Sequence, residues 1–502
     1  MILNKQNLPN IKAAGVTIPS ENLLTLPEKV LQFGTGVLLR GLIDDFIDKA
    51  NKQSIFNGRV VVVKSTSTGG TDAFEQQNGL FTQLIKGIDK GNKVDEIIIN
   101  ASISRVLSAS DNWAEILMVA ANPQLQIITS NTTEVGISLL ADDDVKAAPP
   151  KSFPGKLLAV LLKRYETFAG SLESGFVIVP TELVVDNGTK LKAIVTQLAI
   201  NNKLEEGFMN WLETANDFCN SLVDRIVPGK PSAAYKQTAE SLLGYTDDLM
   251  IMSECYRLWA IETSNKRSRD ILSFSKADEE GIVIVDDINK FRELKLRLLN
   301  GSHTFSCGLA VIGGFSTVKE AMADEVFVSF ITNLANNEIS PAILNQNINL
   351  EQAKAFAVKV LDRYRNPFIE HLWISISAQY TAKMKMRCVP ILQKYFAANE
   401  SVPNYMALGF AAYILFMKSH QNADGKYIGK IDGKEYTITD DAASALHNHW
   451  LGEDIAIVVP FILKDISLWD VDLTSLTGFS DAVIISLNAL IEKGFKQSIA
   501  NI

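Results

Sequence analysis

The 502-residue sequence predicts an α/β N-terminal domain followed by a mainly α-helical C-terminal domain. In the first part of the chain, short β-branched runs alternate with helical stretches, which is typical of a mostly parallel sheet with helices on both faces. A glycine turn joins the first run to the first helix. Later in the chain, long amphipathic stretches dominate. We therefore expect residues 1–285 to form the first domain and residues 286–502 the second.

The N-terminal elements begin with a strand, a glycine turn and a helix. Residues 28–33 are a short apolar run that stops at the glycine turn 34–36, and the apolar residues of 37–51 share one helix face. A second strand at 59–65 completes a βαβ unit. Further strands are expected at 126–130, 175–180 and 281–287, and a helix at 155–168.

The C-terminal part reads as amphipathic helices. The clearest are residues 351–364, 405–420 and 481–495, whose apolar positions recur with helical spacing. Residues 422–440 are rich in glycine and charge and predict a surface hairpin between two of these helices. The second domain should therefore be built almost entirely from helices.

The composition excludes several classes of protein. The net charge of −9 and the lack of a dense Lys/Arg block argue against a nucleic-acid partner. The N-terminus has no apolar signal segment, and the apolar run 455–463 is too short to cross a bilayer. The four scattered cysteines predict no disulfide framework. We expect a cytoplasmic protein without a membrane partner, and the oligomeric state stays open.

The glycine turn has the features of a dinucleotide site. Gly34 permits a tight turn, and Gly36 lets the backbone approach a pyrophosphate at the helix N-terminus, where N–H groups favour anions. Leu39 takes the place of the third glycine of the usual pattern, so the motif is incomplete. A turn without a ligand is the alternative. The expected cofactor contacts in this stretch are Phe33, Gly34, Thr35, Gly36 and Val37.

The second strand ends without the carboxylate that usually binds the ribose 2′-hydroxyl. It ends in Lys64, Ser65 and Thr66, and Lys64 is able to meet a 2′-phosphate, so the residues alone leave NAD and NADP open. Asn131 and Glu134 follow a later strand at the expected cofactor edge. A turn or helix-capping role is the alternative for Glu134.

Three polar residues stand within one leucine-rich helical stretch, residues 293–304. On an α-helix with Lys295 at 0°, His303 falls at about 80° and Asn300 at about 140°, so all three can face one cleft. Interconversion of an alcohol and a ketone needs a base for the hydroxyl proton and donors around the oxygen. A lysine serves as that base when an apolar pocket lowers its pKa. Taken singly, each residue also has an ordinary structural role as its alternative.

The pattern Lys295-x4-Asn300-x2-His303 resembles the signature of the polyol-specific long-chain dehydrogenases, the mannitol dehydrogenase family. Within this family the chain is most similar to the branch that reduces keto-uronates. The resemblance implies a Rossmann-type, doubly wound N-terminal domain and metal-independent transfer from NADH. It also implies that Lys295 is the general acid/base, with Asn300 and His303 beside the reacting oxygen. Supporting stretches are 31–41, 130–138, 222–229, 285–304 and 363–368.

One position departs from the mannitol-type pattern. Those enzymes carry a second asparagine after the strand that matches residues 175–180, and here Leu183 takes its place. This loss leaves Asn300 as the main amide donor at the oxyanion.

A sugar acid needs a local positive pocket in a chain of net charge −9. Arg363 and Lys383 match basic positions of the resembled family and are the expected carboxylate contacts, with bracing of the fold as their alternative. Asn366 and Asp224 complete the expected substrate set. Asp224 is also expected to pair with Arg225, either to shape the site or as a structural salt bridge.

The leading hypothesis is an NAD-dependent reductase of a keto-uronate, a small sugar acid. The nearest alternatives are a fructuronate reductase and a dehydrogenase of a neutral hexitol. A hypothesis of another class is a dinucleotide-binding redox sensor without turnover, but the complete Lys295, Asn300 and His303 set favours an enzyme. We expect no metal site, because His447 and His449 lack carboxylate or thiolate companions nearby.

Overall fold

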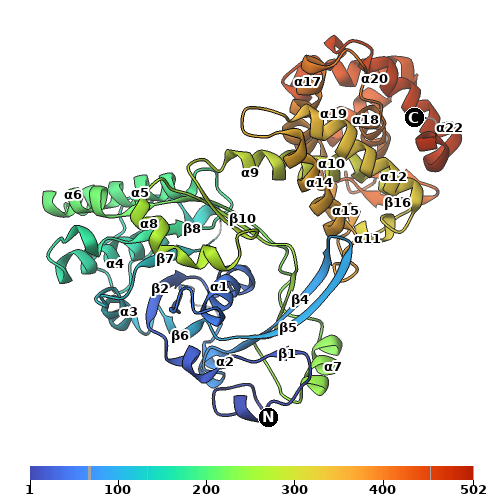
Figure 1. Cartoon of the computed structure of the whole chain (residues 1–502). Helices are drawn as coiled ribbons and strands as arrows, with labels where there is room; N and C mark the ends of the chain where they lie inside the picture. The colour runs from blue at the N-terminus through green and yellow to red at the C-terminus, as the bar shows by residue number, and fades with distance from the viewer. Residues whose placement is uncertain (66–68, 133, 453, 501) are drawn as a thin grey trace. The chain divides into compact units, whose positions relative to one another are not determined.

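The chain folds into two units, which are described separately (Figure 1). The structure is a computed structural model that describes residues 1–65, 69–132, 134–452, 454–500 and 502. Unit 1 comprises residues 1–86 and 93–288, and unit 2 comprises residues 87–92 and 289–502. None of the helices in these described ranges combines the length and the apolar composition needed to cross a membrane.

The main sheet of unit 1 has six parallel strands in the order β6-β3-β2-β7-β8-β9. Numbered within the sheet, this order is 3-2-1-4-5-6, which is the Rossmann arrangement. The expected doubly wound fold is confirmed, and the strand order reverses between β2 and β7. The strands are β2 (Glu28–Phe33), β3 (Arg59–Lys64), β6 (Ile103–Ser108), β7 (Ile127–Ser130), β8 (Val177–Pro180) and β9 (Asp217–Phe218).

Helices cover both faces of this sheet and enclose two hydrophobic cores (Figure 1). Adjacent residues of one strand enter different cores: Val30 packs with α1, and Leu31 packs with α3 to α6. This is why the strands read as continuous apolar runs and not as alternating ones. The helices of unit 1 are α1 (Val37–Lys52), α2 (Asp72–Gln76), α3 (Trp113–Ala120), α4 (Phe153–Thr167), α5 (Asn187–Asn201), α6 (Glu206–Ala215), α7 (Ala233–Leu243) and α8 (Lys266–Ile271).

Two smaller sheets complete unit 1, with strand orders β1-β5-β4-β11 and β10-β12-β13. The strand expected at 281–287 is β13, which pairs with β12 and does not join the main sheet. The turn between β4 and β5 belongs to unit 2, where Gly91 donates its N–H to Asp362 at 3.2 Å. The strands are β1 (Val16–Thr17), β4 (Phe81–Asp89), β5 (Asn92–Asn100), β10 (Asn220–Asp224), β11 (Ile251–Glu254), β12 (Leu258–Glu262) and β13 (Ile282–Val285).

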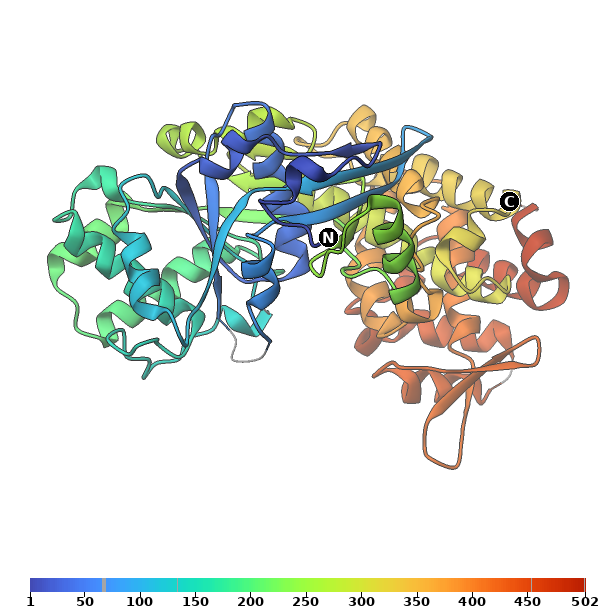
Figure 2. The same ribbon diagram turned by 90° about the horizontal axis from the view of Figure 1, so that it is seen from below.

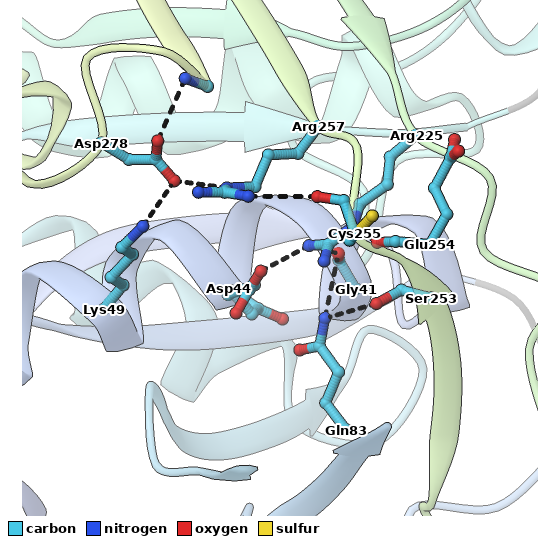
Figure 3. A network of polar contacts seen from close by, with 12 residues as sticks. Gly41, Asp44, Lys49, Gln83, Arg225, Ser253, Glu254, Cys255, Arg257 and Asp278 are labelled. Atoms are coloured by element: carbon cyan, nitrogen blue, oxygen red, sulfur yellow. Dashed lines mark hydrogen bonds and ion pairs between the residues drawn. The ribbon is translucent and has the colours of Figure 1, made fainter. Parts of the chain in front are cut away.

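A network of buried polar side chains fixes helix α1 within unit 1 (Figure 3). Arg225 donates to the Gly41 carbonyl at 2.6 Å and to the Glu254 carbonyl at 2.8 Å, and it forms an ion pair with Asp45. Gln83 donates to the same Gly41 carbonyl at 3.3 Å. The ion pair of Arg225 is thus with α1, whereas the sequence suggested its neighbour in β10. The helix that follows the glycine turn is therefore held at its first turns.

Asp44 lies in the same network, and burial raises its pKa to about 7. Because this pKa exceeds the ordinary value of 3.8, folding favours the neutral acid. The stabilisation that depends on the neutral form of Asp44 is therefore complete below about pH 4. It is lost as the pH rises through 7. We expect the free energy of unfolding of Asp44→Asn, relative to that of the native chain, to increase by at least about 1 kcal/mol from pH 5 to pH 8. This is because one pKa unit corresponds to 1.36 kcal/mol.

Thermal midpoints of both proteins at the two pH values measure this gain. Asp45→Asn is the matched control: it breaks the ion pair with Arg225 and should lower the midpoint at both pH values. An Asp44→Asn difference that is the same at pH 5 and pH 8 would contradict the raised pKa.

Unit 2 is mainly helical, as expected. Helices α10 and α18 approach closely, because a Cβ on Gly308 would lie 2.6 Å from the Ala412 carbonyl oxygen. The helices are α9 (Asn289–Leu294), α10 (Ser302–Ile312), α11 (Val318–Ala321), α12 (Glu325–Asn333), α13 (Ser340–Ala342), α14 (Leu350–Tyr364), α15 (Trp373–Ile376), α16 (Tyr380–Lys383), α17 (Val389–Ala398), α18 (Asn404–Phe416), α19 (Ala443–Trp450), α20 (Ile455–Lys464), α21 (Ile466–Trp469) and α22 (Phe479–Ala500).

Two details of unit 2 differ from the sequence prediction. The expected hairpin at 422–440 is a three-stranded antiparallel sheet, which begins earlier because α18 ends at Phe416 (Figure 2). Its strands are β14 (Ser419–Gln421), β15 (Tyr427–Ile431) and β16 (Lys434–Thr437). Unit 2 also contains the π-helical segments η6 (Lys295–Gly301), η7 (Leu334–Ile339) and η8 (Met384–Cys388).

Candidate active site

The glycine turn lies at the carboxyl end of β2, where the strand order of the main sheet reverses. Gly34 has φ +126°, and a Cβ there would lie 2.9 Å from Leu39 Cδ1 and 3.1 Å from the Asn131 carbonyl oxygen. Gly36 precedes the first turn of α1, and a Cβ on it would meet no atom within 4 Å. The first glycine is thus required by the fold, and the second leaves open space at a helix N-terminus. This arrangement fits the pyrophosphate of a dinucleotide.

The other residues expected around the turn take defined places. Phe33 is fully buried and packs on Phe153 with ring centroids 5.2 Å apart. Thr35 lies in the turn, and Val37 begins α1. Glu134 starts the short 3-10 helix η3 (Glu134–Gly136).

The edge formed by the ends of β7 and β8 is tied together by side chains. Asn131 donates its amide to the Thr181 carbonyl at 3.0 Å and to its hydroxyl at 3.1 Å. The buried Glu182 accepts from the Ser130 hydroxyl at 3.1 Å and from the Thr132 N–H at 2.9 Å. Glu182 could not be recognised from the sequence, because no periodicity marks a single carboxylate after a strand. Leu183, which replaces the second asparagine, is 63% exposed.

A carboxylate, that of Asp111, lies near the end of β3, where the sequence suggested none. Lys64 is buried, and it pairs in the sheet with Ser108 of β6. The carboxylate of Asp111, just beyond β6, has its pKa lowered by hydrogen bonds from Ser108 and Ser110 and by the charge of Lys64. Thr66 lies outside the described residues. The structure thus brings a carboxylate near Lys64 from a separate stretch of the chain.

In unit 2, Lys295 and Asn300 lie on the π-helix η6, whereas the sequence predicted an α-helix. A π-helix closes i→i+5 hydrogen bonds, so residues five apart lie about one turn apart on the same side. On an α-helix the two would diverge by about 140°. Both residues keep partly exposed surface, whereas Leu298 and Leu299, which lie between them in the sequence, are buried. The π-turn therefore brings the lysine and the amide together.

His303 follows in the first turn of α10 and is enclosed by aromatic rings. It stacks on Tyr364 with centroids 4.0 Å apart, and the rings of His371 and Trp373 meet it edge-on at 5.3 Å and 5.8 Å. Tyr364 is itself fixed, because its hydroxyl donates to the Leu299 carbonyl at 2.7 Å. The orientation of the imidazole is thus set by packing.

Positive charges surround this imidazole. Burial, with help from His371, Arg363 and Arg387, holds the pKa of His303 well below its usual range. Its Nε2 atom is buried and has no hydrogen-bond partner within the described part of the chain. His303 is therefore neutral at pH 7 and has an unused ring nitrogen.

The remaining expected substrate residues are only partly brought together. Arg363 lies in the last turn of α14, and its charge lowers the pKa of His303. Lys383 ends α16 and donates to the Ile376 carbonyl at 2.8 Å. Asn366 accepts the Phe368 N–H at 3.0 Å, which is a turn role. Asp224 is a buried residue at the end of β10 in unit 1.

The two closely spaced histidines do not share a site. His447 Nδ1 lies 2.8 Å from the Ser419 carbonyl oxygen, and His449 Nε2 lies 3.1 Å from an Asp465 oxygen. Among the residues whose placement is described, no group of three or more His, Cys, Asp or Glu side chains could hold a metal ion.

Comparison with protein families agrees with this geometry. Residues 28–272 match the mannitol dehydrogenase Rossmann domain, and residues 287–491 match the mannitol dehydrogenase C-terminal domain. The chain belongs to the mannitol dehydrogenase family. It is therefore an oxidoreductase that acts on CH–OH groups and uses a dinucleotide cofactor, as the glycine turn predicted.

Relatives of known function cover nearly the whole chain. The altronate oxidoreductase of Halalkalibacterium halodurans is 39% identical over 95% of this chain and 93% of its own length. That of Bacillus subtilis is 36% identical over 94% of this chain and 95% of its own. Sequence similarity of this extent supports the keto-uronate branch that the motifs suggested.

Solved structures share the fold at lower identity. Pseudomonas fluorescens mannitol 2-dehydrogenase, in a ternary complex with NAD and D-mannitol, is 21% identical with a TM-score of 0.67, over 100% of this chain and 99% of its own. A D-sorbitol dehydrogenase in substrate-free form is 19% identical with a TM-score of 0.79, over 99% of this chain and 100% of its own. At these identities the comparison shows the architecture of the two domains.

Proposed function

We propose that this protein interconverts D-tagaturonate and D-altronate with NAD(H), with Lys295 as the general acid/base. The observation that carries the proposal is the π-turn, which puts Lys295 and Asn300 on one side of a helix that continues into a neutral His303. The sequence similarity to altronate oxidoreductases supports the choice of substrate. No step of this chemistry calls for a metal ion.

The residues of unit 1 fit a dinucleotide. The open space at Gly36 and the N-terminus of α1 suit the pyrophosphate, and Asn131 stands at the neighbouring strand end. Asp111 beside Lys64 favours a free ribose hydroxyl over a 2′-phosphate, because the carboxylate repels a phosphate and offsets the lysine charge. We therefore propose NAD(H) as the cofactor.

In the reducing direction, the ketone oxygen becomes an alcohol oxygen and gains negative charge on the way. When bound, NADH supplies the hydride for the carbonyl carbon. Lys295 gives its proton to the oxygen and regains one from solvent, and Asn300 donates an amide N–H to the same oxygen. His303, being neutral, orients a substrate hydroxyl through its unused Nε2. Arg363, Asn366 and Lys383 of unit 2 are proposed to contact the rest of the sugar acid.

The alternatives make different demands on these residues. A fructuronate reductase or a hexitol dehydrogenase would use the same three reacting residues with another substrate. A redox sensor without turnover has no need for a lysine and an amide on one π-turn.

A substrate panel distinguishes these functions. We expect kcat/KM for tagaturonate with NADH to exceed the values for fructuronate and fructose, and to exceed that for tagaturonate with NADPH. Oxidation of the reduced nucleotide, followed at 340 nm, gives all four values. A preference for fructuronate or fructose would select an alternative enzyme, and binding of NADH without any turnover would select the sensor.

A further inference from the structure

Arg387 is a basic residue of unit 2 whose place next to His303 was not apparent from the sequence. It lies on the π-helix η8, which packs against η6. Arg297 of η6 joins the two segments, because its guanidinium donates to the carbonyls of Met386 and Arg387 at 2.8 Å and 3.1 Å. Arg387 in turn donates to the hydroxyl of Thr304, the residue after His303, at 3.3 Å.

The guanidinium of Arg387 has hydrogen-bonding capacity left over. Its Nε is buried and has no partner in the described part of the chain, and none of the ion pairs found there involves Arg387. Arg297 provides the contrast, since it pairs with Glu293 at 3.3 Å in addition to its two carbonyl bonds. Buried donors are normally satisfied, so an unsatisfied one calls for an explanation. Arg387 keeps partly exposed surface, which leaves it within reach of a ligand.

Among the residues that the structure describes, no carboxylate is paired with this arginine. The groups whose charge would favour it are Cys388 and Tyr364, and burial raises the pKa of both far above 7. Its other charged neighbour is Lys383, whose pKa is lowered by burial and by Arg387. The basic side chains of Arg387 and Lys383 thus lie close together beside the candidate substrate residues, and the carboxylate of Asp440 acts on Lys383 and not on Arg387. Such a gathering costs free energy unless an anion joins it.

We propose that Arg387 is the residue that selects for the substrate's carboxylate, taking it on the guanidinium edge that the chain leaves unpaired. The inference rests on the proposed function, since it concerns the substrate of the same site. The planar fork of arginine matches two carboxylate oxygens, which a lysine cannot do. Lys383, committed to the Ile376 carbonyl, contributes charge without this geometry. Arg387 is therefore a specificity-determining residue beside the three reacting ones.

The test compares Arg387→Gln with the native enzyme on tagaturonate and on tagatose, the corresponding uncharged ketose. We expect KM for tagaturonate to rise about 10- to 150-fold, the loss that corresponds to one charge-assisted hydrogen bond. KM for tagatose should change less than about threefold. Arg387→Lys keeps the charge and loses the fork, so its KM for tagaturonate should lie between that of the native enzyme and that of Arg387→Gln. It also decides the question if Arg387→Gln fails to fold.

The matched control is Lys385→Gln on the same π-helix. Lys385 pairs with Asp470 at 2.7 Å, so the variant removes one positive charge from η8 and should leave both KM values unchanged. Equal losses on tagaturonate and tagatose for both Arg387 variants would overturn the inference while the proposed function stands. A native enzyme that does not reduce tagaturonate would instead contradict the proposed function itself.

Discussion

Replacing Lys295 with alanine is expected to lower kcat for tagaturonate by at least about 10²-fold, the lower range for general acid–base catalysis. The lysine shares one side of the π-turn with Asn300, and the proposal gives it the only proton transfer of the reaction. The Kd of NADH should stay near the native value, because the glycine turn that fits the cofactor belongs to unit 1. Steady-state kinetics and fluorescence titration of NADH measure the two quantities.

Lys290→Ala is the control for this experiment. Lys290 lies on α9, the helix that leads into η6, and its loss removes the same charge without touching the π-turn. The variant should keep native kcat. If Lys295→Ala turns over at a near-native rate, the assignment of the general acid/base is wrong.

The second large effect is expected at the glycine turn, where two alanine substitutions should behave differently. Gly36→Ala meets no protein atom, so its melting temperature should equal that of the native chain. The added methyl group fills space that we assign to the pyrophosphate, and such overpacking costs about 1–3 kcal/mol. The Kd of NADH should therefore rise roughly 5- to 150-fold.

Gly34→Ala should lose stability as well as affinity. Its φ of +126° and the approach to Asn131 make a side chain strained there, at about 1–3 kcal/mol. Fluorescence titration and thermal melting of both variants separate the two roles. Native affinity for NADH in Gly36→Ala would show that the cofactor does not approach this turn.

The elements that the sequence predicted well are those whose pattern is local. The buried strand 28–33, the glycine turn and the helix after it follow from apolar runs and two glycines. Strands β4 and β5 were missed, because their residues mix polar and apolar types without a clear period. The strand at 281–287 was found, but its pairing with β12 in a smaller sheet was not, because an apolar run does not show which strand it pairs with.

The candidate site was predicted in its residue types and not in its geometry. On the predicted α-helix, Lys295 and Asn300 were expected to face one cleft although they would lie about 140° apart around the helix axis. The π-turn removes that divergence. The contacts of Glu182 with Thr132, of Asp111 with Lys64 and of Arg387 with Thr304 could not be found by pattern, because each joins separate stretches of the chain.

An isotope experiment can show whether the enzyme transfers hydride from NADH to a keto-uronate. The enzyme is incubated with tagaturonate and NADH that carries deuterium at the transferred position. We expect altronate with one deuterium on the former carbonyl carbon, in amounts equal to the NAD formed. Tagaturonate recovered unchanged, or NADH consumed without deuterated altronate, would contradict it.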